Sequence, residues 1–545
     1  MFEQVTRGAK VALLSVALLA LSVSVFGQDV SGPGTGGQQA SQAAGSPVVR
    51  KLSVDEAVQM ALEQNLSLQV QRVNPRIQDL NIATVRTAWT PNVTSSLSNG
   101  STDSPSGNIF SGTGVTQTSS NLSWSFGANQ LLPTGGNYQV SWSSSRAKTN
   151  SLFDNINPRL NSNLSASFTQ PLLRNFRIDN TRQQLQISRK NREISDVQLR
   201  QTVLATIRNV KNAYWTLSYN VSSLEVQQQT LDLARESLRN SEARVRIGTM
   251  APMDVIQSQA EVASREEAVI RAQAAVAQAE DQFRALIMDP QTPNFWAMKF
   301  ELTDSPVFQA QAVDVDAAVR KALDARTDLV QQKKTLEEND ISLRYMQNQT
   351  KPDVNLNVRY GLSAQGGTQL SYDYSDVLNP VFLGELRQVG YGSMFKSLLK
   401  NDYPQWSLSV TVGYPIGNSS AEANLARARL QYGQAQTQLR SAELSVVTEV
   451  RDAARNVTTN QKRVESTRAS RELQEKKLEA EQKKFAAGMS TTFFVLQAQR
   501  DLAQARNAEL QAILDYTRSV VDFETVQQAP AFGGSGGGVS IQTGG

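Results

Sequence analysis

A column of apolar residues spaced seven apart constrains the fold of this chain more than any other feature. It runs along a proline-free segment through Val203, Val210, Leu217, Leu224, Leu231, Leu238 and Val245. A straight α-helix drifts against a period of seven, so a helix with such a seam winds left-handedly around its neighbours. We therefore predict one helix, about 100 Å long, over residues 181–247. It needs partner helices of similar length to bury its seam.

Two glycines divide the helical segments into pairs. Gly248 ends the first long helix, and Pro252 suits the first turn of a second helix over residues 252–288. A second proline-free helix is expected over residues 420–487, with Tyr432, Leu439, Val446 and Ala453 spaced seven apart. Gly488 ends it, and another helix follows over residues 491–526.

The layout occurs twice, which predicts two tandem structural repeats. Val315-Asp316 matches Val54-Asp55 at an offset of 315 − 54 = 261 residues, and Pro91 matches Pro352 at the same offset. Ser53 and Glu56 form a capping box that starts a helix extending to about Ala88, with Pro75 as a candidate kink. We expect repeat 1 over residues 52–290, with a first helix, a β region over 91–171, and helices over 181–247 and 252–288. A connector over residues 291–312 follows. We expect repeat 2 over residues 313–528, with a first helix, a β region over 352–415, and helices over 420–487 and 491–526.

Short segments with a period of two predict β-strands between the helices. From Trp406 to Tyr414, five apolar residues alternate with small or polar ones. Aromatic residues at both ends are typical of a lipid-facing strand, whereas a half-buried strand of a soluble sandwich would show the same alternation. We count at least four strands, and six if residues 122–126 and 138–142 form separate strands.

Composition excludes several function classes. The chain has no cysteine and no histidine, so it lacks disulfides, thiol nucleophiles, Cys/His zinc sites and serine–histidine triads. A net charge of +4 without a basic block argues against nucleic acid as a partner. Because no pair of carboxylates is singled out by spacing, we expect no enzyme activity, no metal site and no cofactor.

The N-terminal residues predict export from the cytoplasm. Arg7 and Lys10 precede an apolar run over residues 11–26, which is typical of a signal peptide over residues 1–27. An uncleaved membrane anchor is the alternative. Residues 28–51 are expected to form a flexible linker, and the glycine-rich residues 529–545 a disordered tail. Four or six strands are too few to close a membrane barrel, so we expect copies of the chain to share one barrel.

Taken together, these features resemble the TolC-like outer-membrane efflux proteins. The resemblance rests on the duplicated layout, on Gln170-Pro171-Leu172-Leu173 between strand and helix, on Gly248 and Gly488, and on Asp254-Val255. It implies a mainly α fold with a membrane β-barrel. It also implies a homotrimer with its barrel in outer-membrane lipid and a tunnel of coiled-coil helices in the periplasm. The implied partners are a periplasmic adaptor and an inner-membrane transporter of the RND, ABC or MFS type.

The resemblance also points to an entrance at the helix turns, with Asp254, Phe485, Phe494 and Gln497 as its residues. Similar proteins carry acidic residues six and nine positions after the second glycine, where this chain has Phe494 and Gln497. Some also join an aromatic residue to an arginine, where this chain has Phe485 and Ser490. Phe494 would form an apolar constriction that gates by dewetting. The alternative for the phenylalanines is that both Phe493 and Phe494 pack in the helix seam, and we expect at least one of them to do so. The alternative for Asp254 is an ordinary acid in the first turn of a helix.

The function that follows from the resemblance is a passive export duct of a tripartite efflux or type I secretion system. A trimeric coiled-coil structural or adhesive surface protein is the alternative. An adhesin usually carries one stalk and one barrel at opposite ends of its chain, whereas helices and strands alternate twice here.

Overall fold

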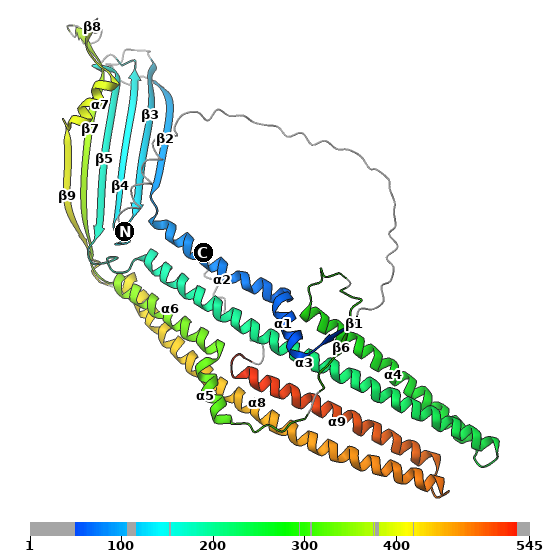
Figure 1. Ribbon diagram of the computed structural model, residues 1–545. Helices are drawn as coiled ribbons and strands as arrows, with labels where there is room; N and C mark the ends of the chain where they lie inside the picture. The colour runs from blue at the N-terminus through cyan, green and yellow to red at the C-terminus, as the bar shows by residue number, and fades with distance from the viewer. Residues whose placement is uncertain are drawn as a thin grey trace, which may run out of the picture. The chain divides into compact units, whose positions relative to one another are not determined.

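The computed structural model describes residues 49–105, 116–151, 154–293, 295–305, 308–373, 375, 381–417 and 419–530 (Figure 1). The expected signal peptide (1–27), residues 28–48 of the expected linker and residues 531–545 of the expected tail lie outside these ranges. In the described part, long helices and one large sheet alternate along the chain, as the two tandem repeats predict.

Two helices of 67 residues each organise the fold: α3 (Asn180–Arg246) and α8 (Ser420–Ala486). A side-chain cap starts each of them, because Asp179 and Ser419 accept a hydrogen bond from the third following backbone N–H. Each helix is followed by an antiparallel partner, α4 (Pro252–Ile287) and α9 (Thr492–Val526). The four spans expected from the sequence differ from these bounds by one residue at most at either end.

The seven-residue column of α3 faces the interior of the helix layer. Val210 and Leu217 are buried beside Tyr214, against Phe283 and Ile287 of α4. Leu231 is also buried, and the other four members of the column are half-buried. In α8 the equivalent residues Val450, Val457 and Val464 are buried as well. Full burial of one such side chain contributes about 1.5–3 kcal/mol, so the column stabilises both helix pairs.

The first helix of each repeat is interrupted, which corrects the expected single helix up to Ala88. Repeat 1 has α1 (Val54–Gln64) and α2 (Leu66–Arg86), followed by a 3₁₀ turn, η1 (Thr87–Trp89). The break lies at Asn65, whose side chain accepts a hydrogen bond from Leu68 N and caps α2, whereas Pro75 lies inside α2. Repeat 2 breaks at Arg326, between α5 (Val315–Ala325) and α6 (Thr327–Gln349), at the same offset of 326 − 65 = 261. The capping box of Ser53 and Glu56 is confirmed.

One antiparallel sheet takes strands from both repeats. Its strands are β2 (Asn92–Pro105), β3 (Thr116–Leu131), β4 (Asn137–Thr149), β5 (Ile156–Pro171), β7 (Asp353–Asp373), β8 (Val381–Val389) and β9 (Pro404–Gly413). Their order is β2-β3-β4-β5-β7, with β9 on one half of β7 and β8 on the other. Residues 122–126 and 138–142 belong to the separate strands β3 and β4, so the larger of the two expected strand counts holds, with β8 in addition.

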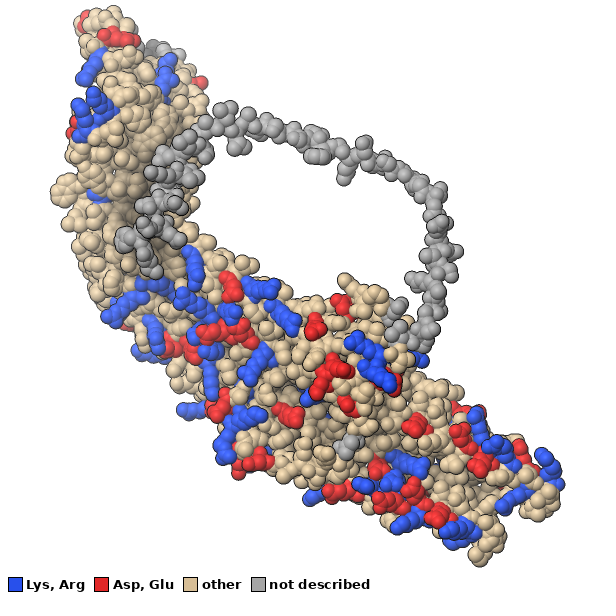
Figure 2. Space-filling model, viewed as in Figure 1, with Lys and Arg blue, Asp and Glu red and all other residues tan. Residues whose placement is uncertain are grey.

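The register gives the sheet one apolar and one polar face. Trp142 lies opposite Leu164, which lies opposite Leu362. On the other face serine hydroxyls pair across strands, as between Ser141 and Ser165, whose Oγ atoms are 2.8 Å apart. Figure 2 shows few charged residues over the strands, whereas charges of both signs cover the helices.

Strand β8 and helix α7 (Tyr391–Lys400) were not expected from the sequence. After β8 the chain crosses the sheet as α7 before it pairs again with β7 as β9. Met394 and Leu398 of α7 are buried against Leu160 and Ala364, on the apolar face of the sheet. Helix α7 ends at Asn401, which has a left-handed backbone with φ 59°.

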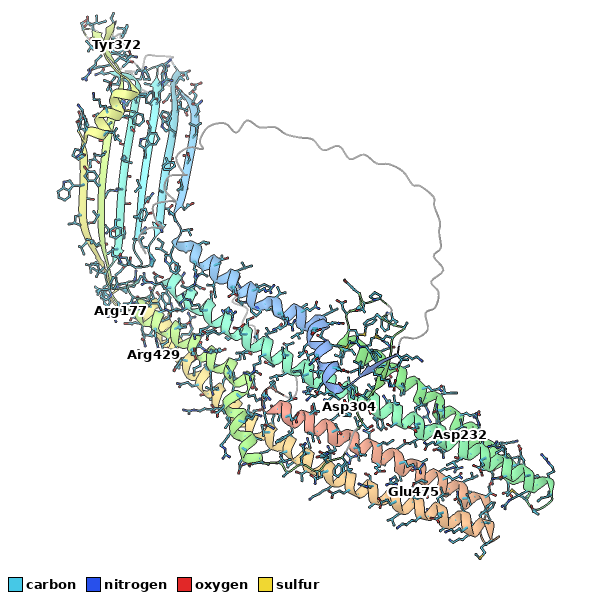
Figure 3. All side chains as sticks on the ribbon, viewed as in Figure 1. Arg177, Asp232, Asp304, Tyr372, Arg429 and Glu475 are labelled. Carbon is cyan, nitrogen blue, oxygen red and sulfur yellow. The ribbon has the colours of Figure 1, made fainter. Side chains whose placement is uncertain are left out.

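A two-stranded parallel sheet corrects the expected linker and connector. Residues 49–51 of the expected linker belong to β1 (Val49–Leu52), which pairs with β6 (Lys299–Leu302) inside the expected connector 291–312. Tyr214 of α3 donates a hydrogen bond from its hydroxyl to Leu52 O (3.0 Å) and accepts one from Asp304 N (3.1 Å). The Asp304 carboxylate, labelled in Figure 3, accepts from Val54 N at 2.7 Å. These bonds attach the start of repeat 1 to α3.

The long helices form one layer whose order follows from the packing. Helices α2 and α4 pack one after the other along α3, and α6 and α9 lie between α3 and α8 (Figure 1). The order is therefore α2/α4, α3, α6/α9, α8. Among the described residues, none of the helices has a stretch long and apolar enough to cross a membrane.

Candidate functional site at the helix tips

The long helices of both repeats end in the same turn. Gly248 and Gly488 both have φ +76°, a left-handed backbone that glycine adopts without strain. Thr249 N donates to Arg244 O (2.9 Å), and Met489 N donates to Lys484 O (2.8 Å). These bonds satisfy last-turn carbonyls of α3 and α8. The result is two equivalent hairpin tips, called here tip 1 (residues 244–258) and tip 2 (residues 481–499).

Both tips expose large apolar side chains. Phe493 and Phe494 are 53% and 55% exposed and contact each other edge to face, with ring centroids 5.6 Å apart. The expectation that at least one of them packs in the helix seam is therefore wrong within one chain. The seam beside them consists of other residues, namely Leu478, Val495, Ala498 and Leu502. The remaining exposed apolar residues at the tips are Ile247, Met253, Ile256 and Met489.

Phe485 contacts an arginine, although not the one that the resemblance suggested. The Arg244 guanidinium of tip 1 lies 4.5 Å from the centroid of the Phe485 ring, in a cation–π contact between the repeats. Ser490, which occupies the position of the family arginine, donates instead to Glu481 at 2.9 Å. A cleft of about 290 Å³ between the tips is lined by Arg244, Phe485 and their neighbours. No pattern in the sequence pointed to Arg244, because the contact joins residues of different repeats.

Gln497 is held along its own helix. Its side-chain amide donates to Asp501 (2.8 Å), and Lys477 of α8 donates to the same carboxylate (2.7 Å). The Lys477 ammonium and the Gln497 amide hold the pKa of Asp501 below its usual range. The carboxylate bound to Gln497 is therefore that of Asp501, which is paired with a lysine.

Asp254 lies half-exposed in the first turn of α4, where a carboxylate interacts favourably with the helix dipole. Its side chain makes no ion pair with any described residue. Asp254 belongs to tip 1, whereas Phe485, Phe494 and Gln497 belong to tip 2. The structure does not bring Asp254 into contact with these three residues.

A buried carboxylate joins the two hairpins behind the tips. Glu261 of α4 is 6% exposed and accepts from Arg265 of its own helix (2.7 Å) and from Arg500 of α9 (2.6 Å). No pattern in the sequence singled out Glu261 and Arg500, which lie 239 residues apart. Because each is an ordinary charge on its own helix, only the packing of both α4 and α9 on α3 identifies the pair.

The strand aromatics lie on the edge strand β9. Trp406 is 76% exposed, and Tyr414, just after the strand, is 58% exposed. Leu408, Val410 and Val412 between them are 58–69% exposed. A contiguous exposed apolar strip of this kind marks a contact surface.

No group of three or more acidic residues within the described ranges is arranged to hold a metal ion. The tips instead combine exposed apolar side chains with a cation–π contact between the hairpins, and an ion pair joins the hairpins behind them.

The fold is that of known outer-membrane channels. The channel OprN is 17% identical, with a TM-score of 0.61 over 92% of this chain and 98% of that chain. The CmeC channel of Campylobacter jejuni is 14% identical, with a TM-score of 0.60 over 87% of this chain and 85% of that chain. The open state of the MtrE channel of Neisseria gonorrhoeae is 16% identical, with a TM-score of 0.58 over 88% and 89%.

Sequence comparison identifies the family. No curated protein matches the chain significantly. The family model described as "Outer membrane efflux protein" matches residues 57–287 and 318–526, one segment in each repeat. These segments cover most of the described helices and strands. The chain belongs to the outer membrane efflux protein family.

Proposed function

We propose that this outer-membrane efflux channel works as a homotrimeric, passive exit duct. Three copies surround one conduit, which receives its substrates from a periplasmic adaptor and an inner-membrane transporter and releases them outside the cell. The transporter is of the RND, ABC or MFS type, and the duct itself catalyses no reaction. The family match favours this function over that of an adhesive surface protein.

The sheet and the helix layer each end with elements of repeat 1 on one flank and an element of repeat 2 on the other. This observation carries the proposal. Within the described residues, β2 pairs only with β3, and β9 pairs only with β7. The helix layer likewise ends with α2/α4 of repeat 1 on one side and α8 of repeat 2 on the other. Because the two flanks differ, copies join head to tail and close into a ring.

The helical flanks carry apolar stripes without a partner in the chain. On α2, residues spaced alternately four and three apart are 46–68% exposed: Leu66, Val70, Val73, Ile77 and Leu80. This is the spacing of a coiled-coil seam. On α8, Leu430, Leu444 and Leu473 are 65–75% exposed. We infer that α2 of one copy packs on α8 of the next, while β2 pairs with β9 and closes a shared barrel.

The faces of the sheet suit such a barrel. Its apolar face, with Trp406 and Tyr414 on the flank, contacts outer-membrane lipid. Its serine- and asparagine-rich face lines the conduit, where hydroxyl and amide groups stay hydrated.

The tips form the periplasmic entrance, near Gly248 and Gly488. Phe494 lines the pore as an apolar collar, and Phe493, one residue away, is the alternative, since both side chains are exposed. Arg244 on Phe485, together with Arg500 on Glu261, holds the two hairpins of one chain against each other. Asp254 and Gln497 flank the collar, and the exposed apolar residues of the tips dock the adaptor.

A mass measurement on the detergent-extracted protein tests the assembly. We expect a trimer that conducts ions across a planar bilayer. A stable monomer with its full β content by circular dichroism would show that the flanks do not pair.

Phe494→Ala tests the entrance, with Phe493→Ala as the matched control. If Phe494 forms the collar, its truncation raises single-channel conductance, because water and ions cross an apolar constriction poorly. Phe494→Asp should make the conductance favour cations. Exchange of the two phenotypes would assign the collar to Phe493, and unchanged conductance in both variants would place the constriction elsewhere.

A further inference from the structure

Helix α7 lies across the apolar face of the sheet. Besides Met394 and Leu398, its aromatic residues pack on strand tryptophans. The ring centroids of Tyr391 and Trp124 are 5.7 Å apart, and those of Phe395 and Trp142 are also 5.7 Å apart. The helix is therefore anchored on β3, β4, β5 and β7 through one of its faces.

The opposite face of α7 carries two basic residues, and one exposed leucine lies between it and the sheet. Leu399 is 85% exposed, and Lys396 and Lys400, one helical turn apart, are exposed as well. Neither lysine makes an ion pair with a described residue. The acid nearest in sequence, Asp402, accepts a hydrogen bond from Ser397.

Two further cations lie on the same face of the sheet. Arg146 is paired in register with Leu160, a residue on which α7 packs, and Lys148 lies two positions further along β4. Side chains two positions apart in a strand share a face, so both belong to the face of Trp142. Both are exposed and make no ion pair within the described ranges. Asp103 of β2 shares this face and lies beyond β3.

The spacing of Tyr138 and Lys148 along β4 fits a barrel in which Lys148 lies at the level of the lipid headgroups. Tyr138 and Lys148 are ten positions apart on β4, about 33 Å along the strand. For a strand tilted by about 40°, this is about 25 Å across a membrane, the height of the apolar band of outer-membrane barrels. Tyr138 lies near the helical end of the sheet, since the preceding Gly135 approaches Asn175, so Lys148 lies at the end remote from the helices.

We propose that α7 and the end of β4 form a binding surface for the anionic headgroup of a membrane lipid, with Arg146, Lys148, Lys396 and Lys400 as its cations. The acyl chains pack on Leu399 and on the apolar face beside α7. An amphipathic helix with lysines beside its apolar face is the usual form of such a contact. The inference rests on the proposed function, because it requires the apolar face of the sheet to contact lipid.

The test is native mass spectrometry of the full-length protein in neutral detergent with phosphatidylglycerol or phosphatidylcholine. We expect the wild type to retain phosphatidylglycerol preferentially. Lys396→Gln/Lys400→Gln and Arg146→Gln/Lys148→Gln should each lower that preference, by about fivefold per cation removed. The matched control is Arg440→Gln/Lys462→Gln, which removes two exposed cations of α8 and should leave the preference unchanged.

Each outcome separates the inference from the proposed function. Equal retention of both lipids by the wild type, or an unchanged preference in both basic-site variants, overturns the inference while trimer mass and conductance stay normal. If inorganic phosphate abolishes the preference at low concentration, the cations recognise free phosphate instead, which also overturns it. Loss of the trimer and of conductance in the wild type would contradict the proposed function itself.

Discussion

The two repeats share one backbone plan but stabilise the same helix pair in different ways. Near the tips, Leu231 and Val269 of repeat 1 are both buried. At the equivalent positions, 231 + 240 = 471 and 269 + 240 = 509, repeat 2 has Arg471 and Glu509, with Nε and Oε2 2.5 Å apart. A hairpin of this length therefore tolerates either two buried apolar residues or an ion pair at these positions.

The ionic contact of repeat 2 belongs to a wider network. Glu475, labelled in Figure 3, accepts from Arg506 (2.8 Å) and from Arg471 (2.9 Å). These two guanidinium groups hold the pKa of Glu475 below its usual range. The network lies between α8 and α9, within the hairpin of repeat 2.

A second difference comes from the surroundings of equivalent helices. Helix α6 lies between α3 and α8, whereas α2 packs on α3 alone within the chain. Ile77 of α2 is accordingly 46% exposed, while its counterpart at 77 + 261 = 338, Glu338, is partly buried and has an oxygen without a hydrogen-bond partner. Equivalent positions in a repeat are therefore not equivalent environments.

The largest expected effect concerns the shared seam. Leu217 and its counterpart Val457 are both 1% exposed. Leu217→Asp and Val457→Asp should each cost several kcal/mol, because a charge is buried without a partner. We expect both to abolish the folded trimer in size-exclusion chromatography. A normal trimer yield for only one variant would show that the seam matters in one repeat alone.

A smaller, unequal effect is expected at the helix breaks. Arg326 is 1% exposed, and its guanidinium donates to Asp328, to Glu449 and to the backbone oxygen of Val526. Asn65 caps α2, and its side-chain amide donates to the backbone oxygen of Leu286. Arg326→Ala should lower the free energy of unfolding by about 3 kcal/mol, since it removes a buried guanidinium from two partly exposed carboxylates and leaves the buried Val526 carbonyl unpaired. Asn65→Ala should cost about 1–2 kcal/mol, mainly through the lost cap. Urea unfolding measures both, and equal losses would contradict the comparison.

The ionic and apolar seams can be exchanged. Glu509→Ala should cost about 1–2 kcal/mol, because Arg471 loses one of its partners. Arg471→Leu/Glu509→Val, which copies the contact of repeat 1, should restore or exceed the wild-type melting temperature. If the double variant is less stable than Glu509→Ala, the network of Glu475 requires Arg471 and the two seams are not interchangeable.

The smallest effect is a pH dependence confined to repeat 2. Burial raises the pKa of Glu338 from 4.5 to about 7. The folded chain therefore binds the proton of the Glu338 carboxyl more tightly than the unfolded chain does. Because of this, the free energy of unfolding falls as the pH rises from about 4.5 to about 7 and stays constant at higher pH. Glu338→Gln should raise the apparent melting temperature by about 1 °C above pH 7 and leave it nearly unchanged near pH 5. Ile77→Gln is the control and should have no pH dependence.

Periodic patterns in the sequence determined the helices, the glycine turns and the duplication. The column through Val210 and Leu217 marks a buried seam, because only one helix face repeats every seven residues. Gly248 and Gly488 end their helices through a left-handed backbone, a local property of glycine. Such features depend on neighbours along the chain, so the bounds of α3, α4, α8 and α9 could be predicted to within one residue.

Contacts between distant segments were decided only by the tertiary structure. Arg244 meets Phe485 and Glu261 meets Arg500 because the α3–α4 hairpin of one repeat packs against the α8–α9 hairpin of the other through α3 and α9. No pattern within any one of these helices reports that choice. Phe493 and Phe494 are exposed because Val495 and Ala498 occupy the seam, a matter of helix register. Helix α7 was not expected from the sequence. Its apolar side chains are buried only because they pack on Leu160 and Ala364 of the sheet.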